Sequence, residues 1–65
     1  MNVILNGETI SVTEKNLEEL CKRFRDHPHN VATAVNGDFI SVRERASCIL
    51  SDGDKIEILS PRQGG

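Results

Sequence analysis

The spacing of apolar residues changes twice along the chain, and this limits the possible folds more than any other feature. Apolar residues stand at every second position in two segments near the N-terminus, namely Met1, Val3 and Leu5, and then Ile10 and Val12. Asn6 and Gly7 separate the two segments and are typical of a type I′ turn, in which both central positions have positive φ. The pattern therefore predicts a hairpin of two half-buried strands.

The period then becomes helical. Apolar side chains recur at i, i+3, i+4 and i+7, which places them on one stripe of a helix. These residues are Leu17, Leu20, Cys21 and Phe24. Asn16, followed three residues later by Glu19, resembles a capped helix start. Pro28 is expected to stop the helix, because it disfavours helical conformation at the preceding residue.

The remainder of the chain returns to strand patterns. Residues 31–35 form a short run of β-branched residues and alanines that ends in Asn36-Gly37, and residues 39–42 read as a short return strand. Residues 43–51 give no clear assignment. After a turn, residues 55–58 alternate again and predict a final strand over residues 55–60.

These elements assemble into an α+β domain, a mixed sheet of four to five strands packed on one helix. The final strand is expected to pair in parallel with the first in the middle of the sheet, since a helix crossover permits a parallel neighbour. Residues 1–60 would form this domain. Residues 61–65 contain no apolar side chain and are expected to form a flexible tail that ends in Gly-Gly.

Size and composition exclude several classes of function. A chain of 65 residues buries only about 60% of its unfolded surface, which argues against a walled catalytic pocket and against an enzyme. A net charge of −2 makes nucleic acid an unfavourable partner. The first residues do not resemble a signal peptide, and no segment has the ~20 apolar residues of a membrane span. We therefore expect a cytoplasmic protein that binds neither nucleic acid nor membrane.

The terminal Gly64-Gly65 pair is the most informative feature for function. Such a pair can be a frayed end or a cloning remnant, but it also suits a carrier whose C-terminal carboxylate reacts. A tail without Cβ atoms can enter a narrow channel, and its carboxylate must first be activated, for example as an acyl adenylate. The chain has no phosphate-binding loop. We therefore expect no bound cofactor, with ATP used in trans by a separate enzyme.

Several motifs resemble a known family when taken in this order. They are Val35-Asn36-Gly37, Leu50-Ser51-Asp52-Gly53-Asp54, Ile56-Glu57-Ile58 and the terminal Gly64-Gly65. In this order, and over nearly the whole chain, they resemble the ThiS family of sulfur carrier proteins. The resemblance implies the β-grasp fold of ubiquitin. It also implies that Gly65 is adenylated and then thiocarboxylated, with Gly64 as its spacer.

The resemblance also implies the partners of such a carrier. These are a ubiquitin-activating-like adenylyltransferase of the ThiF type, a sulfur donor such as a cysteine desulfurase, and a ThiG-type thiazole synthase that receives the sulfur for thiamine biosynthesis. The alternatives are a molybdopterin-synthase-type sulfur carrier and a ubiquitin-like protein modifier or interaction module. The chain departs from the family pattern at Arg45, where an aromatic residue is common, and at Arg62-Gln63, where an apolar residue is common.

Other residues with reactive side chains are better explained by structure. Cys21 on the helix stripe, and Cys48, are interpreted as packing residues rather than nucleophiles. His27 and His29 lack a third ligand for a metal site, and His27 is expected to complement the helix C-terminus. The stretch Arg43-Glu44-Arg45 reads as solvated, and any role for it would be at the rim of a partner surface.

Overall fold

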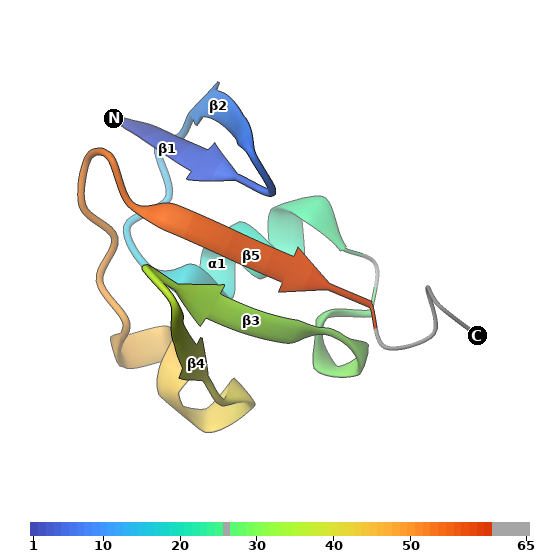
Figure 1. Cartoon of the computed structure of the whole chain (residues 1–65). Coiled ribbons are helices and arrows are strands. Elements are labelled where there is room, and N and C mark those ends of the chain that lie inside the picture. The colour runs from blue at the N-terminus through green and yellow to red at the C-terminus, as the bar shows by residue number, and fades with distance from the viewer. Residues whose placement is uncertain (26, 61–65) are drawn as a thin grey trace.

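The structure is a computed structural model that describes residues 1–25 and 27–60, and its elements follow the predicted order (Figure 1). Two strands precede the helix, and three strands with two short 3-10 helices complete the chain. The elements are β1 (Asn2–Leu5), β2 (Glu8–Ser11), α1 (Leu17–Phe24), η1 (Pro28–Asn30), β3 (Ala32–Val35), β4 (Asp38–Ile40), η2 (Val42–Ser47) and β5 (Lys55–Leu59).

The five strands form one mixed sheet in the order β2-β1-β5-β3-β4. β5 lies in the middle, parallel to β1 and antiparallel to β3, which confirms the predicted place of the last strand. Leu5 lies opposite Ile56 across the parallel pair, and Thr33 lies opposite Ile58 across the antiparallel pair. The predicted mixed sheet of four to five strands on one helix is thus present with five strands.

Both Asn-Gly pairs form turns in which each residue has positive φ. The angles are 49° and 85° at Asn6 and Gly7, and 53° and 88° at Asn36 and Gly37. Asn tolerates this region and Gly occupies it without steric strain, so both predicted hairpins form. The second return strand is shorter than predicted, because the chain enters η2 at Val42.

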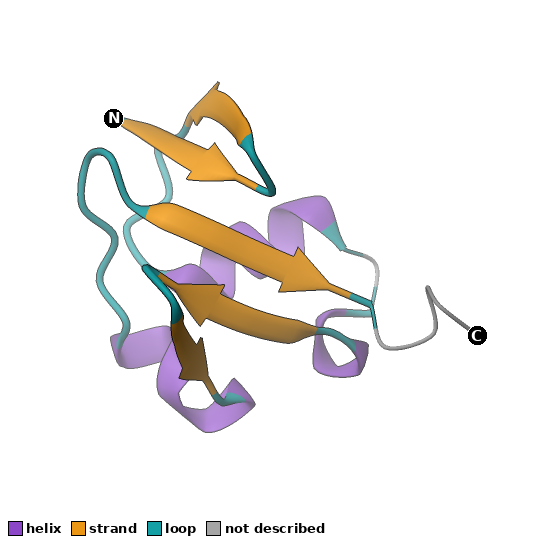
Figure 2. Cartoon of the chain, in the orientation of Figure 1, coloured by secondary structure: helices purple, strands orange, loops and turns teal. Residues whose placement is uncertain are grey.

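Helix α1 packs across one face of the sheet (Figure 2). The Asn16 Oδ1 accepts a hydrogen bond of 2.9 Å from the Glu19 amide, as the predicted cap requires. Leu17, Leu20 and Cys21 are fully buried, whereas Phe24 at the end of the helix is half-buried. The helix ends at Phe24, earlier than expected, and Pro28 begins η1 instead of stopping α1.

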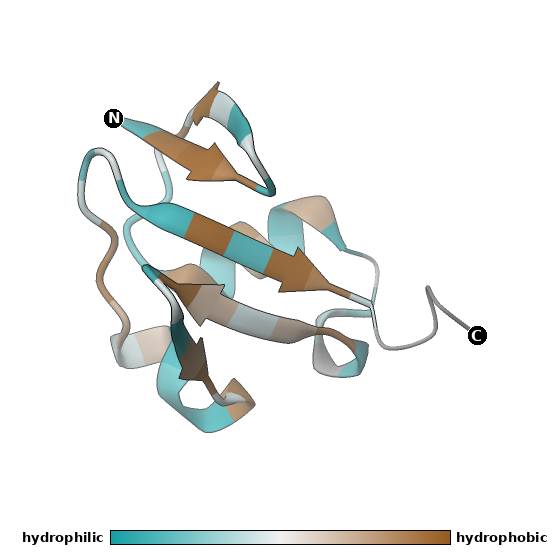
Figure 3. Ribbon diagram, in the orientation of Figure 1, coloured by the Kyte–Doolittle hydropathy of each residue, from teal (hydrophilic) through white to brown (hydrophobic). Residues whose placement is uncertain are grey.

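The two faces of the sheet differ sharply in burial. On β5 this difference follows from the alternation of hydrophilic and hydrophobic residues, which Figure 3 shows. On β5, Ile56 and Ile58 are buried against the helix side, whereas Lys55, Glu57 and Leu59 are exposed. We call the helix-covered side the inner face. The other side is the open face, whose outward residues are Ile4, Thr9, Ala32, Ala34, Phe39, Lys55, Glu57 and Leu59.

The segment that gave no clear assignment contains η2, which packs beside α1. Ser41 and Glu44 form a capping box at its start, and the Glu44 carboxylate accepts hydrogen bonds from the Ser41 amide at 3.1 Å and hydroxyl at 2.9 Å. After η2, the Cys48 carbonyl accepts a 3.0 Å bond from the Leu17 amide. These contacts join the segment to the start of α1. In the described part of the chain, no helix has the length and apolar character that crossing a membrane requires.

Candidate functional site

The predicted reactive residues, Gly64 and Gly65, lie outside the described residues, as does the whole predicted tail of residues 61–65. The structure does describe the strand to which this segment is joined. β5 is paired on both sides, with β1 as far as Ile56 and with β3 up to Leu59. The last described residue, Ser60, directly follows this central strand, so the candidate site begins at the end of β5.

Two side chains bind the end of β5, one from the turn after β1 and one from the residue that follows α1. The Asn6 Nδ2 donates to the Ile58 carbonyl at 3.1 Å, and the Ile58 amide donates to Asn6 Oδ1 at 3.0 Å. The Arg25 guanidinium also donates to the Ile58 carbonyl, at 3.3 Å. Sequence reasoning interpreted Asn6 only as a turn residue and did not find these contacts.

The open face beside this strand carries exposed apolar side chains. Phe39 and Leu59 are 69% and 56% exposed. Ala34 pairs with Phe39 on one side and with Glu57 on the other, and Ala32 pairs with Leu59. Because paired residues share a face of the sheet, these apolar side chains form one surface that reaches from β4 to the end of β5.

A shallow hollow of about 420 Å³ lies on the open face between the two Asn-Gly turns. Its lining includes Ile4 from β1, Lys55 and Glu57 from β5, and both turn glycines, Gly7 and Gly37. Ile56 of β5 also lines it, so the hollow, which is open to one side, combines two apolar with two oppositely charged residues. It therefore suits contact with another protein's surface better than enclosure of a small substrate.

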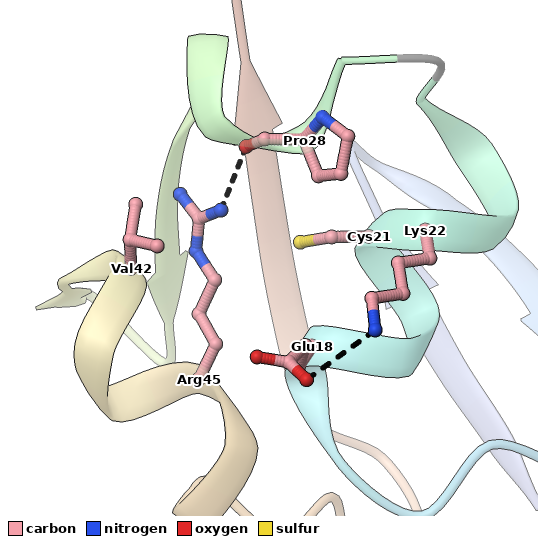
Figure 4. A pocket seen from close by; sticks show the side chains of 6 residues that line it. All are labelled: Glu18, Cys21, Lys22, Pro28, Val42 and Arg45. Atoms are coloured by element: carbon pink, nitrogen blue, oxygen red, sulfur yellow. Dashed lines mark hydrogen bonds and ion pairs between the residues drawn. The ribbon is translucent and has the colours of Figure 1, made fainter.

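The prediction that Arg45 is solvated is wrong, because Arg45 is only 3% exposed. The guanidinium donates to three oxygens: Thr33 Oγ1 at 3.0 Å, the Pro28 carbonyl at 2.8 Å and the Val31 carbonyl at 2.7 Å. Arg45 thus joins η2 to the segment before β3 (Figure 4). It contributes no rim to a partner surface.

The geometry of η2 explains the burial of Arg45. A 3-10 helix has three residues per turn, so Val42 and Arg45 lie on one side. That side faces α1, whereas Arg43 and Glu44 are exposed. The spacing of Ser41 and Glu44 is the sequence signal that could have identified a helical turn here.

The cavity beside Arg45 has no room for a substrate. Glu18, Cys21, Lys22, Pro28, Val42 and Arg45 line a space of about 30 Å³, which holds about one water molecule. Glu18 and Lys22 form an ion pair of 3.5 Å at its exposed side. The site therefore belongs to the packing of η2 on α1.

Both cysteines pack in or against the core, as predicted. Cys21 is fully buried and Cys48 is half-buried. Burial raises the pKa of the Cys21 thiol, although Arg45 and Arg25 act against this. Burial also raises the pKa of the Cys48 thiol, with Asp54 and Glu44 adding to the effect. Both thiols are accordingly weak nucleophiles near neutral pH.

His27 was expected to complement the C-terminus of α1, but Arg25 does so instead. His27 lies three residues beyond the end of α1 and is exposed, whereas the Arg25 guanidinium donates to the Phe24 carbonyl at 2.8 Å in the last turn. The side chain of His29 lies outside what the structure describes. Among the described residues, no group of three His, Cys, Asp or Glu side chains is arranged to hold a metal ion.

Comparisons with known proteins agree with the fold and the order of motifs. The model of the ThiS family matches residues 3–65. The crystal structure of the thiamine biosynthesis protein ThiS from Geobacter metallireducens superposes with a TM-score of 0.81 at 26% sequence identity, and the match covers 100% of both chains. None of the curated proteins matches significantly. The family match over almost the whole chain and the shared β-grasp fold together show that the chain belongs to the ThiS family, the sulfur carrier proteins of thiamine biosynthesis.

Proposed function

We propose that the chain carries sulfur as a thiocarboxylate at Gly65 and donates it for thiazole formation. The observation that carries this proposal is the attachment of residues 61–65 to the central strand of the sheet. A strand paired on both sides gives the reactive end a fixed origin. Gly64 then serves as a spacer that can enter a narrow channel, since it has no Cβ atom.

The chemistry follows from the reactivity of a terminal carboxylate, which is ionised at neutral pH and resists nucleophiles. A carboxylate oxygen of Gly65 attacks the α-phosphorus of ATP, pyrophosphate leaves, and an acyl adenylate forms. The terminal sulfur of a donor persulfide then attacks the acyl carbon and AMP leaves, which gives an acyl disulfide. A thiol reductant cleaves the S–S bond and releases the thiocarboxylate. An adenylyltransferase of the ThiF type supplies the ATP site, and a donor such as a cysteine desulfurase supplies the persulfide sulfur.

The state of the two thiols supports Gly65 over a cysteine as the sulfur-bearing residue. Transfer through a persulfide requires an accessible thiolate. Cys21 is fully buried, and burial raises the pKa of both thiols. The chain acts as a cosubstrate that other proteins modify, not as an enzyme.

The open face is the surface that suits these partners. Phe39 and Leu59 present exposed apolar side chains beside the strand that leads to Gly65. Contiguous exposed apolar residues on a small protein mark an interaction site. Docking of this face by the adenylyltransferase, and later by a ThiG-type thiazole synthase, would bring the terminal glycine to each active site.

Tandem mass spectrometry tests the proposal. The chain is incubated with ATP, a ThiF-type adenylyltransferase, a cysteine desulfurase, cysteine and a thiol reductant, and the position of the new sulfur is determined. We expect one oxygen of the Gly65 carboxylate to be replaced by sulfur. The variant Cys21→Ala/Cys48→Ser should accept sulfur equally well once its folding is verified, and deletion of Gly64-Gly65 should abolish acceptance.

Two other results would each point away from the proposal. Sulfur on Cys48 with an unmodified Gly65 would identify a persulfide carrier. An isopeptide bond between Gly65 and a lysine of another protein, with no thiocarboxylate, would identify a protein modifier.

A further inference from the structure

Two asparagine side chains hold β5 at its opposite ends. Asn6 bonds the amide and the carbonyl of Ile58, near the end of the strand. Asn36 bonds the Lys55 amide at 3.0 Å and the Asp54 carboxylate at 3.0 Å, at its start. Both residues stand first in an Asn-Gly turn and have φ near 50°. Among the described residues, β5 is thus held by two asparagine clamps. Asn6 makes two bonds to its backbone next to the candidate site, and Asn36 makes one bond to its backbone at the opposite end.

The Asn6 side chain makes the hydrogen bonds to β5 that the backbone of β1 no longer makes at this point. Along the β1 side of β5, the Ile4 amide bonds the Asp54 carbonyl and the Asn6 amide bonds the Ile56 carbonyl, each at 2.9 Å. Ile58 is the next residue of β5 in this series. At this point the chain of β1 turns away through Asn6-Gly7, and the Asn6 carboxamide supplies one donor and one acceptor to Ile58. It thus extends the parallel ladder by one step.

Arg25 strengthens the same point from the helix side. Its guanidinium donates to the Ile58 carbonyl, so this oxygen accepts from both Asn6 and Arg25. β1 itself pairs with β5 only as far as Ile56. Without these side chains, the last residues of β5 would be held by β3 alone.

We propose that Asn6 is a positioning residue that fixes the direction in which the reactive end leaves the sheet. Gly65 is seven positions beyond Ile58, a reach of at most about 25 Å. If the end of β5 is held less tightly at Ile58, the terminal carboxylate samples a larger volume, and its effective concentration at the ATP site of the docked enzyme falls. Asn6 thereby raises the fraction of docked complexes in which the carboxylate meets ATP. The inference rests on the proposed function of Gly65.

The second clamp provides a matched control. Asn6→Gly and Asn36→Gly each keep a residue that accepts positive φ, and each removes a side chain that bonds β5. Losses of stability should therefore be similar, and denaturant titration would verify this. Only Asn6→Gly removes the bonds next to the tail.

The kinetic test is pyrophosphate exchange catalysed by a ThiF-type adenylyltransferase with each variant as substrate. We expect Asn6→Gly to lower kcat about tenfold, less than the ~100-fold that a 1 Å misplacement of a reacting group can cost. KM should change less than about twofold, because the open face is intact. Asn36→Gly should match the wild type in both constants, and Asn6→Asp, which can accept from the Ile58 amide but not donate to its carbonyl, should lie between.

Amide hydrogen exchange provides a readout that does not depend on activation. Leu59 pairs with Ala32 and has no bond to Asn6. Its amide should exchange faster in Asn6→Gly and stay protected in Asn36→Gly. Unchanged protection of Leu59, or an equal fall of kcat in the two glycine variants, would overturn the positioning role. If the wild type supports no pyrophosphate exchange, the proposed function is overturned instead. The protection of the Leu59 amide in the two glycine variants would still decide the role of Asn6.

Discussion

The inner and open faces of the sheet come from the same strands but are used differently. On the inner face, β5 contributes Ile56 and Ile58, each 1% exposed beneath α1. On the open face, Phe39 is 69% and Leu59 is 56% exposed. Within residues 1–25 and 27–60 the chain has one α-helix of about two turns, α1, which covers one face of the sheet. Stability is therefore concentrated on the inner face, and the apolar residues of the open face remain available for contact with another protein.

The largest expected effect is on the inner face. Leu20→Ala should lower the free energy of unfolding by about 2 to 5 kcal/mol, because Leu20 is fully buried and its truncation leaves a cavity. Phe39→Ala, which removes more atoms from the open face, should change it by less than about 0.5 kcal/mol. Denaturant titration of both variants measures the contrast. Similar losses in the two variants would contradict the division between the faces.

A second contrast compares the buried Arg45 with an exposed arginine of the same 3-10 helix, η2. Arg45→Met retains an unbranched side chain but leaves two backbone carbonyls and the Thr33 hydroxyl without their donor. We expect a loss of about 2 to 4 kcal/mol. Arg43→Met, at an exposed position of the same 3-10 helix, should stay within about 0.5 kcal/mol. Equal stability of the two variants would mean that Arg45 does not hold η2 in place.

The open face should show the reverse behaviour, with an effect on binding and little on folding. Leu59→Ser and Phe39→Ser should each weaken binding to a ThiF-type adenylyltransferase about tenfold, which is about 1.4 kcal/mol, by removing apolar contact. Isothermal titration calorimetry measures this affinity. Thr9→Ser, on the same face but on the outer strand β2, should bind like the wild type. Unchanged affinity in both Leu59→Ser and Phe39→Ser would exclude this surface as the docking site.

The smallest expected effect concerns the cap of η2, the element that carries Arg45. Hydrogen bonds from the Ser41 backbone and hydroxyl hold the pKa of Glu44 below its ordinary value of 4.5. Since the folded pKa is the lower one, ionised Glu44 stabilises the protein above the unfolded pKa, and this contribution disappears as pH falls through the folded pKa. Glu44→Gln should therefore be less stable than wild type at pH 7, and in thermal unfolding the difference should shrink as pH falls below the ordinary pKa of 4.5. A difference that does not depend on pH would contradict the cap as its cause.

Much of the fold could be predicted because its signals are local. Alternation identified the strands of the first hairpin and β5, and a run of β-branched residues and alanines identified β3. The stripe from Leu17 to Phe24 identified α1, and each Asn-Gly pair identified a turn. The central place of β5 followed because a helix crossover, unlike a hairpin, permits a parallel neighbour. The limits of α1 were less certain, because Pro28 marks only the latest point at which the helix can end.

The missed contacts depend on residues that are distant in sequence. Arg45 lies among charged neighbours, and only the packing of η2 beside α1 brings it to the carbonyls of Pro28 and Val31. Asn6 carries a strong turn signal, which conceals its bonds to Ile58. Neither interaction has a periodic pattern. The predicted roles of Gly64 and Gly65 rest on chemistry and family membership.

The central position of β5 also links synthesis of the chain to its folding. Asn6 and Ile58 are 52 positions apart, and β1 has no partner in the middle of the sheet until β5 has emerged from the ribosome. Contacts of such sequence separation form late. A chain that stops before β5 therefore cannot assemble the open face. An adenylyltransferase that recognises this face would ignore incomplete chains, so recognition of the fold would also verify that synthesis has reached the strand next to the reactive end.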